Sequence, residues 1–345
     1  MIRPPRTIGV VGFSYVQSSD NRILVMESRF MRFNHFRFAL LLGVICLFNA
    51  SVRAAGYGPG DILIADFSGD RIAVYDSGFT FQGYLNNSTG FDGVAGLDLT
   101  AGNNLVAVNR NNARLREYDS AGNVISNFVN GSIGLPIDVK IGPNGNAYVG
   151  TQSGATGVLE VSLAGVNQGT YTGASWDAVA IIPNKGTNGV LWAGTDGFAG
   201  TITEYDLVTR ASLGSISIGA GRRASTMHYD SVTDRVLISD TNTDDILEFN
   251  PAGTLTDTLT GVGIGNSQGL WRLPNGTTYA TGGTDVYEFN AAGTHVATHD
   301  ISGDVTHALG IVVVPVPLPA AAWAGLILLC GLGAARSRNR SRTSS

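Results

Sequence analysis

The sequence predicts an all-β protein, and three observations lead to this prediction. Glycine is abundant, with 46 residues in 345, and charged residues make up only 14%. This composition disfavours long helices, because glycine in a helix interior is about 1 kcal/mol less favourable than alanine. Hydrophobic residues, at 43%, are close to the norm for globular proteins, which argues against disorder. The apolar runs are short and are separated by Gly, Asn, Asp and Pro, the residues that turns between strands require.

A short phrase recurs six times in the middle of the chain and defines a repeat. Its second residue falls at positions 75, 118, 161, 205, 249 and 289, so successive copies are 43, 43, 44, 44 and 40 residues apart. The copies are Val74-Tyr75-Asp76, Glu117-Tyr118-Asp119, Glu160-Val161-Ser162, Glu204-Tyr205-Asp206, Glu248-Phe249-Asn250 and Glu288-Phe289-Asn290. Around the second copy we expect four strands, at 96–99, 104–108, 114–119 and 123–129. Four short strands in 40–45 residues are the spacing of a β-propeller blade.

The two ends of the repeated region predict how the ring of blades closes. The first repeat starts directly at Asp61 and lacks the first strand of the other copies. A surplus strand follows the last repeat at about residues 307–314, and it can complete blade one. Such a closure joins the chain ends and removes exposed sheet edges. The prediction is therefore a six-bladed β-propeller with four-stranded blades over residues 56–315.

Individual phrases of the repeat resemble the NHL family of propeller repeats. Residues 64–76 and 238–249 are similar to the middle of that repeat, and Pro143 to Val149 is similar to its Pro-x-Gly-Asn turn. The third and fourth copies match poorly. The resemblance implies the same propeller architecture for the whole repeated region.

The formal net charge of -5 is unevenly distributed along the chain. Residues 1–55 carry +5, residues 56–315 carry -14, and residues 316–345 carry +4. Both cysteines, Cys46 and Cys330, lie in the basic tails, so the middle can form neither a disulfide nor a thiolate metal site. The acidic balance gives no reason to expect nucleic-acid binding. Tails of opposite charge to the middle indicate a separate role for the tails.

Residues 31–54 are predicted to be a secretory signal peptide. A basic stretch begins at Met31-Arg32, an apolar run extends from Phe38 to Phe48, and cleavage is expected after Ala54. The apolar run has 11 residues, which is too short for the roughly 20 that a bilayer-spanning helix needs. Residues 1–30 fit no signal pattern. We therefore expect translation to start at Met31 or Met26, with residues 1–30 a mis-assigned upstream extension.

Residues 316–345 form a tail with three parts. A short motif comes first, an apolar stretch continues to Ala335, and Arg336, Arg338, Arg340 and Arg342 end the tail. An apolar helix of this kind can insert in a membrane with its basic end in the cytoplasm. The motif consists of Val316, Pro317, Leu318, Pro319, Ala320, Ala321, Ala322 and Trp323.

This tail resembles the VPLPA variant of the PEP-CTERM sorting signals. The resemblance implies transient insertion in the inner membrane of a Gram-negative bacterium and processing by an exosortase-type membrane enzyme. It also implies delivery to the cell surface or to the extracellular matrix, in a bacterium that makes extracellular polysaccharide. The tail departs from the pattern at Ser337, Asn339 and Ser341, which separate the arginines. The alternative is a plain single-pass anchor.

A ligand site is predicted at a mouth of the propeller's central channel, near the start of each first strand. The residues there do not repeat from blade to blade, as expected of a binding site. Aromatic side chains among acids suit a sugar or a cationic ligand. The candidate residues are Asp138, Trp176, Asp177, His228, Trp271 and His307.

Three other patterns are interpreted as structural. Residues 265–269 fit the G-x-S-x-G pattern of serine hydrolases but precede no helix. Residues 240–244 begin like a calcium loop, but Asp245 and Pro251 stand where Gly and Glu are needed. The glutamate is present in five of the six copies, so it belongs to the repeated pattern and is expected to stabilise the blades. We therefore predict no catalytic residues, no bound metal and no cofactor.

The functional prediction is a surface-associated binding or scaffold module, with polysaccharide or surface proteins as partners. A metal-dependent, lactonase-like hydrolase on the same fold is the alternative. In such enzymes Glu, Asn and Asp ligands lie at the channel mouth, and Asp138 and Asp177 would be tested first. A purely structural surface protein is the second alternative.

Overall fold

The computed structural model describes residues 14–17, 22–25, 54–85, 92–129, 133–152, 157–173, 176–195, 197, 199–259 and 263–317. The chain divides into two units, Met1–Ser51 and Val52–Ser345. In the first unit, β1 (Ser14–Gln17) and β2 (Arg22–Val25) form an antiparallel pair. Most of the predicted signal peptide and the sorting tail from residue 318 onwards lie outside the described residues. The part of the chain that the structure describes contains no helix that is long and apolar enough to cross a membrane.

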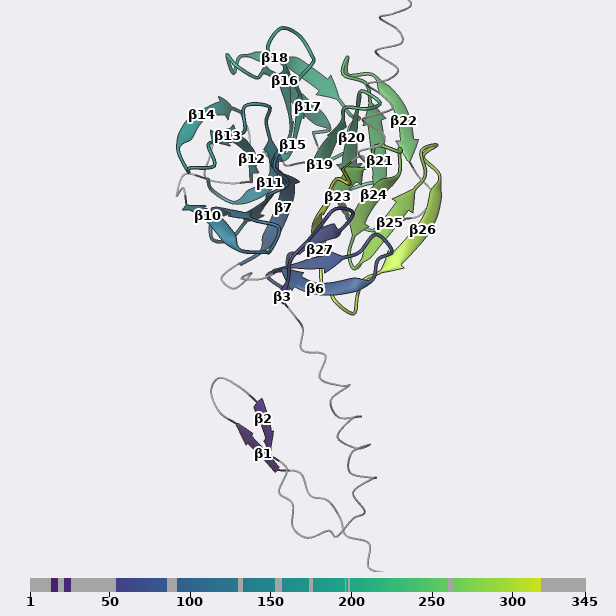
Figure 1. Ribbon diagram of the computed structural model, residues 1–345. Coiled ribbons are helices and arrows are strands. Elements are labelled where there is room, and N and C mark those ends of the chain that lie inside the picture. The colour runs from purple at the N-terminus through teal and green to yellow at the C-terminus, as the bar shows by residue number, and fades with distance from the viewer. Residues whose placement is uncertain are drawn as a thin grey trace, which may run out of the picture. The chain divides into compact units, whose positions relative to one another are not determined.

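The second unit is a six-bladed β-propeller, as the repeat predicts. Six sheets stand around a central axis, and each contains four antiparallel strands in the order of a meander (Figure 1). The innermost strand of each blade packs against the innermost strands of both neighbouring blades. The ring is therefore closed on itself.

The strands of the six blades fall into four concentric sets. The innermost strands are β27 (Ala308–Val313), β7 (Val94–Leu99), β11 (Pro136–Ile141), β15 (Trp176–Ile182), β19 (Ala224–Asp230) and β23 (Ser267–Arg272). The second strands are β4 (Ile62–Asp66), β8 (Leu105–Asn109), β12 (Ala147–Thr151), β16 (Val190–Thr195), β20 (Arg235–Asp240) and β24 (Thr278–Gly282). The third strands are β5 (Arg71–Tyr75), β9 (Arg114–Tyr118), β13 (Gly157–Val161), β17 (Thr201–Asp206), β21 (Asp245–Phe249) and β25 (Asp285–Phe289). The outermost strands are β6 (Phe81–Leu85), β10 (Val124–Val129), β14 (Asn167–Thr172), β18 (Ser212–Ser217), β22 (Leu255–Leu259) and β26 (His295–Asp300).

Blade 1 is assembled from both ends of the repeated region. The last strand, β27, pairs antiparallel with β4, with Ala308 opposite Asp66 and Val313 opposite Ile62. This pairing confirms the predicted closure by a strand at about residues 307–314. A C-terminal strand thus completes a blade whose other strands come from the start of the domain.

The recurring phrase forms the end of the third strand in every blade, and burial explains why it recurs. Its second residue exposes 3% or less of its surface in all six copies. Burying an aromatic or branched side chain contributes about 1.5–3 kcal/mol. One such residue per blade therefore supports the packing of each sheet on its neighbours. The six residues are Tyr75, Tyr118, Val161, Tyr205, Phe249 and Phe289.

The innermost strands approach one another closely at their third residue. Three of the six residues at this level are glycine, and a side chain there would collide with the next strand. A Cβ atom on Gly96 would lie 2.8 Å from Cα of Asp138, and one on Gly310 would lie 2.4 Å from the carbonyl oxygen of Ala95. In every blade the register between the innermost and second strands shifts near this point. The axis is consequently tightly packed at this level.

An N-terminal strap seals the junction between blades 1 and 2. It begins with β3 (Ala54–Ala55), which pairs parallel with the last two residues of β6, Tyr84 and Leu85. Tyr57 is 6% exposed, and its hydroxyl accepts a 2.9 Å hydrogen bond from the amide of Leu105 in blade 2. Gly60 then donates a 2.9 Å hydrogen bond to the carbonyl of Val314. The strap therefore brings the start of the domain beside its end.

Candidate ligand-binding pocket on the exit face

The ring has two faces, the entrance face, where the innermost strands begin, and the exit face, where they end. A pocket of about 690 Å³ opens on the exit face, and we call it the end pocket. This volume lies within the roughly 300–1,000 Å³ of small-molecule sites. Blades 2 to 6 all contribute to its walls, which carry both apolar and charged groups. Its chemically informative residues are Asp98, Glu117, Lys140, His228, Tyr229 and Trp271.

Asp98, the fifth residue of β7, lies in the wall of the end pocket. Its carboxylate accepts a 2.6 Å hydrogen bond from the amide of Ile141 in the next blade. Burial raises the pKa of Asp98 to about 6, although the charge of Lys140 and the amide of Ile141 act in the opposite direction. The fold therefore holds a carboxylate where its charged form is poorly solvated, which is common at functional sites.

Lys140 joins the end pocket to the axis of the ring. Its Nζ lies 2.8 Å from Oδ1 of Asp138, and the two side chains form an ion pair that is largely shielded from solvent. Oδ2 of Asp138 accepts hydrogen bonds from the amide of Val179 at 3.0 Å and from the hydroxyl of Thr226 at 3.3 Å. Asp138 is 3% exposed. Its two oxygens thus join three blades and orient Lys140, which lines the pocket.

His228 and Trp271 form an aromatic pair on the opposite wall of the end pocket. Their ring centroids are 4.8 Å apart with an interplanar angle of 45°. Burial, together with the charges of Lys140 and Arg272, lowers the pKa of His228 to about 3. The imidazole is therefore neutral at ordinary pH and offers the pocket no positive charge. Trp271 is partly exposed and presents apolar surface to the pocket.

The rim of the pocket includes the turn between β7 and β8. Nδ2 of Asn104 donates a 2.8 Å hydrogen bond to Glu117, which also lines the pocket. The same turn is fastened to the strap, because the Tyr57 hydroxyl lies 3.1 Å from the carbonyl oxygen of Asn103. Across the pocket, the Tyr229 hydroxyl donates a 2.9 Å hydrogen bond to Asp234. The rim is thus held by contacts on both sides.

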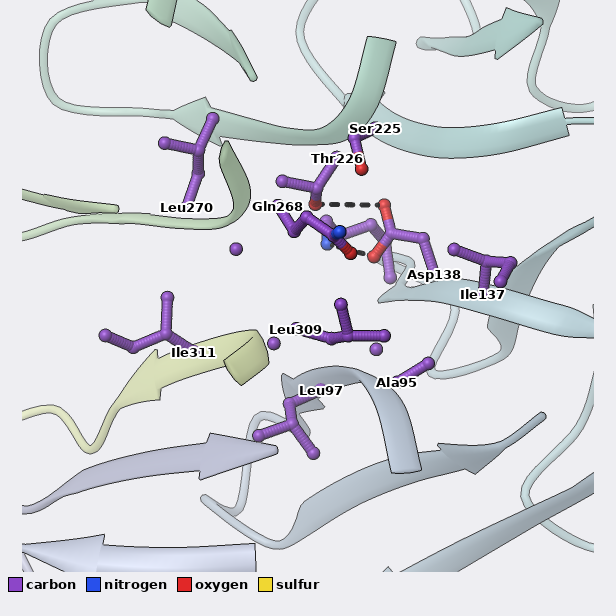
Figure 2. A pocket seen from close by; sticks show the side chains of 14 residues that line it. Ala95, Leu97, Ile137, Asp138, Ser225, Thr226, Gln268, Leu270, Leu309 and Ile311 are labelled. Atoms are coloured by element: carbon purple, nitrogen blue, oxygen red, sulfur yellow. Dashed lines mark hydrogen bonds and ion pairs between the residues drawn. The ribbon is translucent and has the colours of Figure 1, made fainter. Parts of the chain in front are cut away.

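A second, much smaller cavity lies on the axis near the entrance face (Figure 2). Its volume is about 20 Å³, which is room for about one water molecule. The second to fourth residues of five innermost strands surround it, among them Gly96, Asp138, Gln268 and Gly310, together with Lys140. Figure 2 shows the Asp138 carboxylate beside the Thr226 hydroxyl, with Ala95, Leu97, Leu309 and Ile311 below them. The axis itself is too tightly packed at this level for a sugar-sized ligand.

The structure distributes the six predicted site residues over both faces. His228 and Trp271 are each the fifth residue of their strands and lie together at the exit face, not near the strand starts. Trp176 is the first residue of β15, at the entrance face. Asp177 follows it, is 1% exposed, and its Oδ2 accepts from Nε of Arg223 at 2.9 Å.

His307 also lies at the entrance face, immediately before β27. The centroid of its ring lies 5.9 Å from that of Phe67, in an edge-to-face arrangement. Its backbone amide donates a hydrogen bond to the carboxylate of Asp66. A ligand site that uses all six predicted residues would therefore need to span the ring. The ligand-binding role of these residues stays a prediction.

The recurring glutamates make contacts that stabilise the blades. Each lies on a third strand and binds a side chain from its own blade or from the next. Glu160 accepts from Nη2 of Arg210 at 2.7 Å, Glu248 from Nη1 of Arg272 at 2.7 Å, and Glu288 lies 3.0 Å from Nε2 of His299. Glu204 accepts from the indole of Trp192 at 2.6 Å.

The acidic turn at residues 240–244 is likewise engaged by protein groups. Asp240 is fully buried, and its carboxylate accepts from the amides of Asn242 at 3.1 Å and Arg223 at 3.0 Å. It also pairs with Arg222 at 3.0 Å. Ser267 of the serine-hydrolase pattern is fully buried at the start of β23. Among the described residues, no three His, Cys, Asp or Glu side chains gather closely enough to hold a metal ion.

Sequence reasoning missed Asp98 and Lys140. Each lies near the end of an innermost strand, where a charged residue interrupts an apolar run: Asp98 between Leu97 and Leu99, and Lys140 between Val139 and Ile141. A charged residue at the same position in two successive repeats was the available signal. Asp98 and Lys140 are one repeat apart in sequence, so an alignment of the repeats places them side by side on neighbouring innermost strands.

Comparisons with solved structures give the same architecture. A protein of unknown function from Bacteroides caccae matches with a TM-score of 0.59 at 14% identity, over 74% of this chain and 98% of that one. A chain of a nidogen/laminin complex matches with a TM-score of 0.61 at 12% identity, over 74% and 98%. Virginiamycin B lyase from Staphylococcus aureus matches with a TM-score of 0.53 at 12% identity, over 72% and 85%. At these identities the likeness shows the fold alone.

No protein-family model matches the sequence. No curated protein matches it either.

Proposed function

We propose that this protein is an exported β-propeller that binds carbohydrate in the end pocket, at the cell surface or in extracellular polysaccharide. The observation that carries the proposal is the composition of that pocket. It combines the apolar face of Trp271 with the poorly solvated carboxylate of Asp98 and the ammonium group of Lys140. The proteins of similar fold include a chain from a laminin complex and a lyase, so the fold alone does not decide between binding and catalysis.

The mixture of charges in the end pocket favours a neutral, polyhydroxylated ligand. An anionic ligand would meet Asp98 and Glu117, and a cationic ligand would meet Lys140. Sugar hydroxyls both donate and accept hydrogen bonds, so they can use carboxylates and an ammonium group together. The apolar face of a sugar ring can lie against Trp271, which also offers an indole N–H donor.

The proposed surface location rests on the tails of the sequence, and the end of the propeller is compatible with it. Val314 is 3% exposed, whereas Val316, the first residue of the proposed sorting motif, is 69% exposed. The chain therefore leaves the folded ring just before the motif. A membrane enzyme could reach a motif placed there without unfolding the last strand.

Replacing Trp271 with alanine should weaken binding of neutral oligosaccharides about 10- to 100-fold, because about 1.5–3 kcal/mol of aromatic contact would be lost. The measurement is titration calorimetry of the full chain in mild detergent with a panel of neutral oligosaccharides. Trp271→Phe keeps an aromatic face and should retain part of the affinity.

A matched control exists on the other face of the ring. Phe67 contacts His307 as Trp271 contacts His228, but it lies at the entrance face. Phe67→Ala should leave the affinity unchanged. No detectable sugar binding by the wild-type chain, or equal losses in Trp271→Ala and Phe67→Ala, would contradict the proposal.

Removing residues 316–345 should abolish retention at the cell surface and release the propeller into the medium. The reason is that the deletion removes the whole proposed sorting signal but leaves β27 intact. Cell fractionation and immunoblotting of the producing bacterium would measure this. Unchanged localisation of the truncated protein would refute the sorting role.

A further inference from the structure

The end pocket opens on the face from which the C-terminal tail leaves the propeller. β27 ends at Val313 on the exit face, alongside the ends of the other innermost strands. Val312 and Val314 belong to one hydrophobic cluster, against which Leu99 and Trp271 are packed. Leu99 and Trp271 also line the end pocket. The start of the tail and the pocket wall are thus neighbours.

Little chain separates the ring from the apolar part of the tail. After Val314, the residues Pro315 to Pro319 precede the apolar stretch that starts at Ala320. Five residues span at most about 18 Å even when fully extended. If the apolar stretch is inserted in a membrane, the exit face is held close to that membrane. In that arrangement the entrance face, at the other end of the axis, points away from the membrane.

We propose that the end pocket is screened from polymeric ligands while the tail is anchored, and becomes accessible to them once the tail is released. This inference rests on the proposed function of the pocket and on the proposed insertion of the tail in a membrane, because it describes when that site can act. It requires no change of shape in the propeller. The short connection between Val314 and the apolar stretch is sufficient.

The experiment compares the accessibility of the two faces in the full chain, reconstituted in lipid vesicles. One variant carries Ser231→Cys, at the exposed rim of the end pocket, and its control carries Asn112→Cys, on the exposed turn between β8 and β9 at the entrance face. Cys46→Ser and Cys330→Ala remove the native thiols. The probe is a maleimide attached to a long polyethylene glycol, and a small maleimide serves to show that both thiols are reactive.

A third variant makes the test specific for the length of the connection. It carries Ser231→Cys and a flexible Gly/Ser insertion of roughly 30 residues after Pro317, which spans about 30 Å on average. We expect the long probe to label Ser231→Cys several-fold more slowly than Asn112→Cys in vesicles. The insertion should restore the rate, and the small maleimide should label all three variants equally.

Two results would overturn the proposal. One is equal labelling of the two faces by the long probe in anchored protein, and the other is a chain that fails to float with the vesicles. Sugar titrations of the detergent-solubilised chain test the proposed function separately. Screening without any sugar binding would refute the carbohydrate role and leave the orientation of the pocket intact.

Discussion

Replacing Asp66 with alanine should lower the free energy of unfolding by about 3–5 kcal/mol. Asp66 is fully buried at the end of β4, and its Oδ1 accepts from the hydroxyl of Thr306 at 2.7 Å and from the amide of His307 at 3.1 Å. Oδ2 accepts from Nε of Arg71 at 3.0 Å. The substitution would leave these donors without their acceptor at the seam where the two ends of the domain meet.

The loss of unfolding free energy in Asp66→Ala should depend on pH in a defined direction. Burial opposes ionisation of Asp66, but hydrogen bonds from Thr306, His307 and Arg71 outweigh it and hold the pKa below its usual 3.8. A lowered pKa stabilises the fold fully above the usual value, and this contribution disappears as pH falls through the folded-state pKa. The difference between wild type and Asp66→Ala should therefore shrink in strong acid.

Urea unfolding of the full chain would measure the effect, with Asp76→Ala as the control. Asp76 also accepts backbone hydrogen bonds, from Gly78 and Thr80 at 2.9 Å each, but it lies in an exposed turn at the outer part of the same blade. Its replacement should cost much less than that of Asp66. Asp66→Asn, which keeps an acceptor oxygen, should fall between them. Equal losses of unfolding free energy in Asp66→Ala and Asp76→Ala would contradict the stabilising role that we assign to Asp66 at the seam.

Asp98→Asn should have opposite effects on stability and on binding. At pH 7.5 we expect the variant to be about 1–2 kcal/mol more stable than wild type, because it removes a poorly solvated charge. The asparagine oxygen can still accept the hydrogen bond from Ile141. Sugar affinity should fall about 10- to 100-fold, since a hydrogen bond to a charged group contributes about 1.5–3 kcal/mol.

The pH dependence separates this explanation from a general packing effect. Because the folded-state pKa of Asp98 is raised to about 6 from the usual 3.8, its destabilisation is complete above pH 6 and is relieved as pH falls toward 3.8. The stability gain of Asp98→Asn should therefore disappear near pH 4. Asp257→Asn, on an outermost strand, provides a control that should show neither change. A stability gain of Asp98→Asn that persists at pH 4 would refute the explanation by a poorly solvated charge on Asp98.

The architecture could be predicted from sequence because every blade repeats the same packing. One buried residue near the end of each third strand recurs at intervals of 40–44 residues, and turn residues separate the strands around it. The surplus strand at the C-terminus could pair only with the blade that lacked one. These are local patterns, and their consequences do not depend on the details of contacts between blades.

The repeat alignment could place Asp98 and Lys140 on neighbouring strands, but the contacts of the candidate site could not be predicted, because they cross from blade to blade. The bond from the amide of Ile141 to Asp98 joins residues 43 positions apart, and that from Val179 to Asp138 joins residues 41 apart. Such contacts depend on how neighbouring innermost strands align, and the register shifts near the strand starts are not visible in the sequence. For the same reason His228 and Trp271 were expected at the strand starts but lie near the ends.

The pairing of β27 with β4 also sets the order in which the protein can fold. Asp66 and its partner Thr306 are 240 residues apart in sequence, so this contact is among the last that a chain emerging from its N-terminus can make. Long-range contacts of this kind slow folding, because the intervening loop must be ordered first. Until β27 arrives, β4 presents an unpaired edge that can join another chain. Synthesis therefore has to deliver nearly the whole chain before the protein is protected from aggregation.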